Sequence, residues 1–135
     1  MSSSGVAGAV TGPVGGLLAS LDELAGQEPA VVASAALRAD LLALLAATNR
    51  LHAELARRVA AADASGSCTA DGFRSVGAWL RAFGRLSIAS SARLVRAARV
   101  LRQLPALATA AGRGDVSAEH IRRVDLLVER VGVDV

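Results

Sequence analysis

The feature that most limits the fold is a long helical repeat of apolar side chains in the first half of the chain. It consists of Leu41, Leu44, Leu45, Thr48, Leu51, His52, Leu55, Val59 and Ala62. Steps of three and four residues form one face of an α-helix. The helical pattern extends from about Ala30 to Ala64, and at 1.5 Å per residue such a helix is about 50 Å long.

Two interpretations of this stripe remain open. A helix of that length exceeds what a small domain needs to cover its own core, so part of the stripe could pack against another chain, as in a homodimer through the long helix. Alternatively, the stripe spans one elongated helical domain. The charged residues lie mostly off the stripe, where Arg50 with Glu54 and Glu54 with Arg58 form i,i+4 pairs.

Composition points to the same fold class. Aromatic residues make up only 2% of the 135 residues, whereas 53% are hydrophobic. The core must therefore be built from Leu, Val and Ala, and Leu and Ala are strong helix formers. We expect an all-α, single-domain helical bundle with one long helix and a helix-turn-helix-like pair. Residues 1–16 are rich in Gly and Ser and predict a disordered tail. The helical domain is then 17–135, and its first short helix is Leu17–Ala25.

The second half contains shorter helices with clear start signals. Ser75, Ser87 and Ser117 each precede a helical pattern and are predicted N-caps. The helix after Ser87 is expected over Ile88–Gln103, and Pro105 is placed to open the next one. Trp79 has apolar neighbours at helical spacing, which favours the core over base stacking. In the last helix the apolar residues predicted to face inward are Ile121, Val124, Leu127, Val128 and Val131.

A search for reactive groups finds no catalytic constellation, metal site or cofactor site. His52 and His120 lack ligand partners at metal-binding spacing, and no serine is paired with a positioned histidine and acid. Cys68 is the single cysteine; it excludes an internal disulfide, and we interpret it as an incidental loop residue. The chain lacks a signal peptide and a membrane span, so we expect a cytoplasmic protein.

Charge is unevenly distributed along the chain. Residues 1–70 carry four Arg and six acids, whereas residues 71–135 carry eleven Arg and six acids. Between Gly72 and Gly114 there are eight Arg and no acid. An ordinary solvated helix intersperses both signs, so this segment favours an anionic partner, double-stranded DNA. The predicted DNA-binding residues are Arg74, Arg81, Arg85, Ser87, Arg93, Arg96 and Arg99. The alternative is a solvated surface whose arginines reflect coding bias.

The same segment resembles a known family. Its matching residues are Gly72, Ser75, Trp79, Leu80, Leu86, Ser87, Ala92, Val95, Ala98, Leu101, Leu104, Pro105, Ala110, Gly114, Ser117 and His120. They resemble the actinobacterial 13E12 repeat family, whose N-terminal module is domain of unknown function 222. The resemblance implies a DNA-associated accessory module in front of an HNH endonuclease domain. That family's nuclease residues have no corresponding positions in this sequence.

A weaker resemblance is to the helix-turn-helix of ParB-type partition proteins. It rests on Leu104-Pro105, Gly114, Ser117 and His120. The turn at Phe83–Ser87 and the serine at position 91 depart from that pattern. Together these observations predict a non-catalytic DNA-binding module, the N-terminal part of an HNH-nuclease-like protein. The alternative is a helical oligomerisation or protein-interaction scaffold that does not bind nucleic acid.

Overall fold

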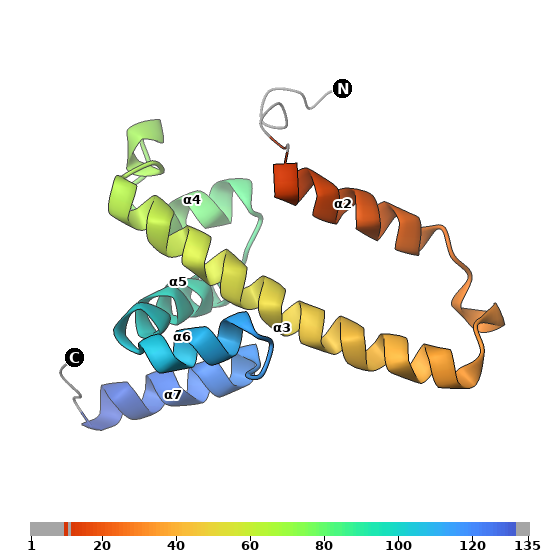
Figure 1. Ribbon diagram of the computed structural model, residues 1–135. Helices are drawn as coiled ribbons and strands as arrows, with labels where there is room; N and C mark the ends of the chain where they lie inside the picture. Colours follow the sequence, from red (N-terminus) through yellow and green to blue (C-terminus); the bar gives the residue numbers. More distant parts are fainter. Residues whose placement is uncertain (1–9, 11, 132–135) are drawn as a thin grey trace. The chain divides into compact units, whose positions relative to one another are not determined.

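A computed structural model of the chain describes residue 10 and residues 12–131. It confirms the all-α class: the described residues form six α-helices and two short 3-10 helices, and none of them is in a strand (Figure 1). Contacts divide the chain into two compact units, Met1–Asp40 and Leu41–Val135.

The first unit contains α2 (Gly12–Ala25), the 3-10 helix η1 (Pro29–Val31) and the beginning of α3. The helix expected at Leu17 begins at Gly12 instead, so the expectation of a disordered tail was wrong for residues 12–16. Pro13 explains the earlier start, because its fixed φ suits the first turn of a helix. The rest of the predicted tail, residues 1–9 and 11, lies outside the described residues apart from Val10.

The predicted long helix is present as α3 (Ser34–Ser65), whose 32 residues correspond to about 48 Å. It starts four residues later than the expected Ala30 because Pro29 and Ala30 belong to η1, where the Glu28 carboxylate accepts a hydrogen bond from the Ala30 amide at 3.2 Å. Most of α3, from Leu41 onward, belongs to the second unit.

The second unit continues through η2 (Thr69–Asp71), α4 (Val76–Phe83), α5 (Ile88–Gln103), α6 (Pro105–Gly112) and α7 (Ala118–Val131). The bounds predicted for α5 are confirmed, and so is the start of α6 at Pro105. Helix α5 packs against α4, α6 and α7, which makes it the central helix of this unit (Figure 1).

Serine caps fix the starts of three of these helices, as the sequence predicted. The Ser75 and Ser87 hydroxyls accept hydrogen bonds from the amides of Ala78 and Ser90. Ser117 caps α7 reciprocally: its hydroxyl accepts from the His120 amide at 3.2 Å, and its own amide donates to His120 Nδ1 at 3.2 Å. An imidazole thus takes the place that Glu or Gln occupies in a capping box.

The core of the second unit is built mainly from small aliphatic side chains. α5 contributes the largest share, including Leu94, Val100 and Leu101, and α7 contributes Ile121. Helix α3 packs through Ala53, Ala56 and Val59. Alanine allows close approach of helix backbones, so most leucines of the α3 stripe are not needed in this contact. They are exposed instead.

Gly114 marks a close contact between α3 and the segment that joins α6 to α7. Its φ is +84°, and a Cβ at this position would lie 2.9 Å from the Ala46 carbonyl oxygen. The Asn49 side chain donates a hydrogen bond to the Gly114 carbonyl at 3.3 Å. Only glycine combines this backbone conformation with this approach.

Helix α7 buries a narrower face than the sequence predicted. Ile121 is buried, and Val124 and Val128 pack partly against the core. Leu127 and Val131 are 56% and 63% exposed, so their predicted inward orientation was wrong. The reason is that the bundle covers only the arc of α7 centred on Ile121, and both residues lie beyond its edge.

Candidate nucleic-acid interface

The turn between α4 and α5 is fixed by hydrogen bonds to the end of α4, and its Arg85 side chain is exposed to solvent. The amides of Gly84 and Leu86 both donate to the Leu80 carbonyl, at 2.8 and 3.4 Å, and Leu86 packs partly against the core. Arg85 lies between them with φ of 58°, the one positive φ among described residues other than glycine. The turn therefore presents the Arg85 side chain to solvent, where it is exposed.

The beginning of α5 is also accessible. Ile88 is 76% exposed, and the Ser87 hydroxyl, which accepts the capping bond from the Ser90 amide at 3.0 Å, still has its own hydrogen to donate. Ser91 is only 1% exposed. Its hydroxyl donates to the Ile88 carbonyl at 3.0 Å, so a serine fits this position without an unsatisfied polar group.

Trp79 belongs to a small aromatic cluster beside this turn. Its ring lies 5.3 Å from that of Phe83, which in turn makes an edge contact with Phe73 at 5.5 Å. The indole Nε1 donates to the Asp71 carboxylate at 3.3 Å. Trp79 packs partly against the core, in agreement with the core interpretation.

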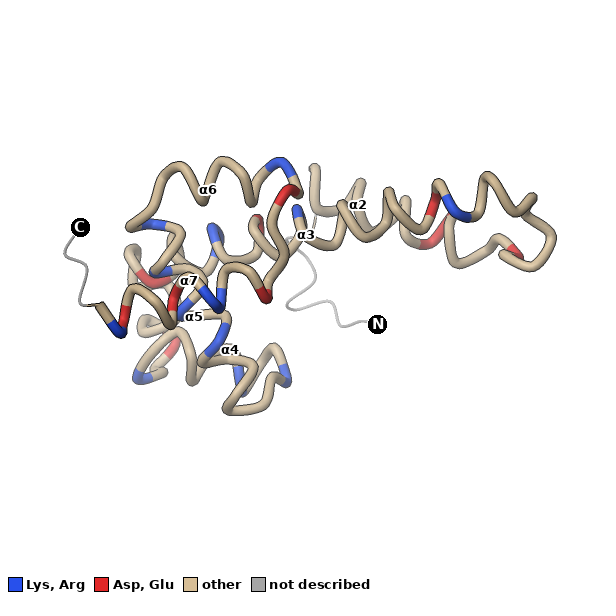
Figure 2. The backbone as a smooth tube through the Cα atoms, turned by 90° about the horizontal axis from the view of Figure 1, so that it is seen from below, with Lys and Arg blue, Asp and Glu red and all other residues tan. Residues whose placement is uncertain are grey.

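All eight arginines between Gly72 and Gly114 are exposed. Of these eight, only Arg96 and Arg113 have a carboxylate of the described chain within ion-pair distance. The other six have none: Arg74, Arg81, Arg85, Arg93, Arg99 and Arg102. Figure 2 shows basic positions on α4, α5 and α7, with acidic ones on α7. Six cations without partners leave this surface with an uncompensated positive charge.

Arg96 is occupied within the protein. Its Nε donates to Asp125 at 3.1 Å and its Nη2 to Glu129 at 2.8 Å, both on α7. These hydrogen bonds, first that to Glu129 and then that to Asp125, raise the pKa of Arg96 above its usual value. Of the residues predicted to contact DNA, Arg96 is the one that joins two helices.

A groove of about 650 Å³ lies between α3, α5 and α7. Its apolar wall includes Leu55, Leu94 and Ile121, and its charged groups are Arg93, Arg96, Glu119, Arg122 and Asp125. The groove thus brings Arg93 together with Arg122, a residue that sequence reasoning missed. No periodicity links α5 to α7, so only the packing of the two helices reveals this pair.

His52 of α3 also lines the groove and is half-buried. Burial lowers the pKa of His52 below its ordinary value, because the charged imidazolium loses hydration there. The side chain is therefore kept neutral beside the arginines of the groove.

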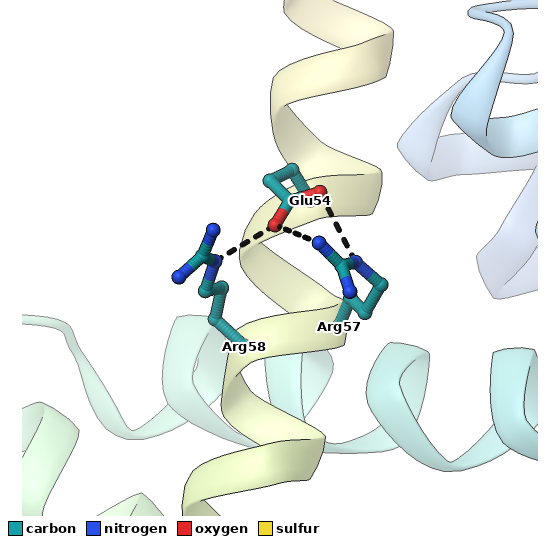
Figure 3. Close-up of polar contacts among 3 residues, drawn as sticks. All are labelled: Glu54, Arg57 and Arg58. Atoms are coloured by element: carbon teal, nitrogen blue, oxygen red, sulfur yellow. Dashed lines mark hydrogen bonds and ion pairs between the residues drawn. The ribbon is translucent and has the colours of Figure 1, made fainter. Parts of the chain in front are cut away.

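The arginines of α3 differ from those of α5. Arg57 and Arg58 both donate to the Glu54 carboxylate, each with a shortest contact of 2.8 Å (Figure 3). Hydrogen bonds from Arg57 and then Arg58 lower the pKa of Glu54. These two arginines, which share one carboxylate partner, can therefore be compared with the arginines on α4 and α5 that have none.

Three further features were considered in the sequence: Cys68, groups of metal ligands and helices that could span a membrane. Cys68, which the sequence placed in a loop, is only 6% exposed and belongs to the core. No three His, Cys, Asp or Glu side chains of the described chain gather where they could hold a metal ion. None of its described helices combines the length and apolar character needed to cross a bilayer.

Comparison with known proteins gives one match. The family described as "Domain of unknown function (DUF222)" matches residues 35–135, which confirms the predicted resemblance to that domain. No curated protein and no solved structure matches. The resemblances to the 13E12 repeat family and to ParB-type proteins stay predictions.

Proposed function

Because the chain belongs to the DUF222 family, which carries no established function, we propose from its own surface that it is a non-catalytic module that binds double-stranded DNA. The observation that carries the proposal is the absence of acids between Gly72 and Gly114 together with six exposed arginines that have no partner in the described chain. Arginine matches phosphate oxygens through two parallel hydrogen bonds.

In this proposal the α4–α5 turn and the exposed side of α5 face the duplex. Arg85, Arg93 and Arg99 contact phosphates or base edges, and the Ser87 hydroxyl donates to a phosphate. Arg74 and Arg81 contact the flanking backbone. Arg122 adds a cation from α7, because it lines the same groove as Arg93. The Arg96 side chain supports α7 against α5 and contributes less to binding than its neighbours.

The test is fluorescence anisotropy of a labelled duplex with the parent and two double variants that each remove two positive charges. Arg93→Ala/Arg99→Ala should weaken binding at least about tenfold and lower the salt slope by about two. Arg57→Ala/Arg58→Ala, on α3, is the matched control and should bind like the parent. If the α5 variant binds as tightly as the parent, the proposal is wrong.

We further propose that the domain stands as an accessory module of an HNH-nuclease-like protein. This rests on the resemblance of residues 72–120 to the 13E12 repeat family. Joining the domain to an HNH nuclease segment should raise cleavage of duplex DNA, and Arg93→Ala/Arg99→Ala should remove that gain. Equal cleavage with and without the domain would contradict an accessory role.

A scaffold without nucleic-acid binding is the second candidate, because one observation favours it. Leu41, Leu44, Leu51 and Leu55 of α3 are 46–55% exposed, and contiguous apolar exposure marks an interaction surface. A protein that binds no duplex at low salt but self-associates through α3 would support the scaffold.

A further inference from the structure

Helix α3 has two apolar faces, and the second unit uses only one of them. Ala53 is buried and Ala46 and Ala60 are half-buried, at intervals of seven residues on the side that packs against the bundle. We define the leucine seam as Leu41, Leu44, Thr48, Leu51 and Leu55. A helix that is apolar on two sides requires two partners.

The spacing of the leucine seam is that of a coiled coil. Its residues follow one another at steps of three, four, three and four, which places them at the a and d positions of two consecutive heptads and at the a position of the next. Leu37 extends the spacing by one further position. Ala46, Ala53 and Ala60 are then at position f, opposite the a and d side. Ala56 and Val59, the other buried residues of α3, are at b and e. The bundle and the seam therefore occupy different sides of one helix, and these sides meet at Leu55, which also lines the groove between α3, α5 and α7.

From this spacing we infer that the leucine seam binds a second copy of the same chain, so that two α3 helices form a coiled-coil dimer. A two-fold contact places the same surface on both sides, and a seam of leucines at a and d is complementary to itself. This inference is independent of the proposed DNA binding.

The polar groups along the seam are compatible with burial. The Thr48 hydroxyl donates to the Leu44 carbonyl at 2.8 Å, so it needs no partner from the second chain. At the adjacent positions, Ala47 is uncharged, His52 is kept neutral by burial, and Glu54 is bound by Arg57 and Arg58 (Figure 3). The seam residues from Leu41 to Leu55 are all uncharged, so the seam itself places no like charges against each other.

Both ends of the seam support this assignment. Leu42 and Leu45, beside its first turn, are 71% and 62% exposed, so the apolar surface is widest where the second unit does not cover the helix. At the other end the next d position is Arg58, whose charge ends the seam after Leu55. From Leu41 to Leu55 the contact is about 21 Å long.

The experiment is sedimentation velocity of the full chain from about 1 to about 100 μM. Leu44→Glu/Leu51→Glu places two acids in the seam at positions that are already exposed, so the core of the bundle is unchanged. Ala43→Glu/Ala61→Glu adds the same charge to α3 at exposed positions outside the seam. Circular dichroism and thermal unfolding verify that each variant is folded.

We expect the parent to reach twice the 13.6 kDa of one chain, and the alanine-site variant to match it. The leucine-site variant should dissociate with a Kd at least about 100-fold higher. A parent that stays monomeric at the highest concentration overturns the inference. So does a dimer whose Kd is the same in the leucine-site variant. If the parent is monomeric and the leucine-site variant alone has a lower melting temperature, the inference is again wrong. That result would show that another segment of the same chain covers the seam.

Discussion

The Arg96 Nη2 lies 2.8 Å from a Glu129 carboxylate oxygen, although the two residues are 33 positions apart in the sequence. With the second bond from Arg96 to Asp125, this contact joins the central helix α5 to α7. One arginine thus links the stability of the bundle to the charge of the proposed DNA-binding surface.

This link predicts opposite effects on stability and on DNA affinity. In Asp125→Asn/Glu129→Gln, Arg96 loses its ion pairs, so the melting temperature should fall. The same variant releases a cation and removes two acids, so DNA should bind more tightly, with a salt slope steeper by about one. Thermal unfolding and anisotropy measure the two effects. Glu54→Gln, which releases arginines on α3, is the control, and an unchanged melting temperature in the double variant would contradict the structural role of Arg96.

Gly114→Ala should destabilise the second unit by about 1–3 kcal/mol. The added Cβ requires a positive φ of an alanine and lies 2.9 Å from the Ala46 carbonyl oxygen, so α3 must move away from the α6–α7 connection. Chemical denaturation measures the change. Gly112→Ala is a suitable control, because a Cβ there meets no atom within 4 Å. Equal stability of the two variants would show that the close approach is absent in solution.

His52 should make the protein less stable in mild acid. Burial lowers its folded-state pKa, so the unfolded chain takes up the proton first as the pH falls. The contribution of neutral His52 is therefore fully present above its ordinary pKa of about 6.5 and is lost below it. Unfolding free energies of the parent and of His52→Gln, compared from pH 8 to pH 5, should converge toward acid. Parallel curves would contradict the burial of His52.

The Cys68 thiol should be protected in the folded protein. It is 6% exposed, and burial, with the nearby carboxylates of Asp71 and Asp63, raises its pKa. Since only the thiolate attacks disulfide reagents, the native protein should react on the order of 100-fold more slowly than the unfolded chain. A colorimetric thiol assay with and without denaturant measures the ratio. A native rate close to the unfolded one would contradict the burial of Cys68.

Local signals predicted much of the fold. A serine cap is formed by the serine and the amides of the next turn, so Ser75, Ser87 and Ser117 could be located without tertiary information. The missing acids between Gly72 and Gly114 were equally visible. By contrast, the pair of Arg93 with Arg122 and the bridge from Arg96 depend on how α5 and α7 pack. The spacing of residues within each helix does not show how the two helices pack against each other.

The two faces of α3 show a second limit of sequence reasoning. Helical periodicity identifies apolar stripes but does not say which one the chain covers itself. The leucines gave the stronger signal, yet the α3 residues buried in the core are Ala53, Ala56 and Val59. Charge has the same ambiguity: Arg57 and Arg58 share the Glu54 carboxylate, whereas Arg93 and Arg99 have no carboxylate partner in the described chain.

The affinity of the parent protein for a DNA duplex across a salt series tests the central proposal most directly. We predict binding at low salt and a linear fall of log K with log salt, with a slope of about −3 or steeper, which corresponds to at least three or four phosphate contacts. Absence of binding at low salt, or binding with a slope near zero, would contradict the proposal that the arginines of α4 and α5 contact DNA.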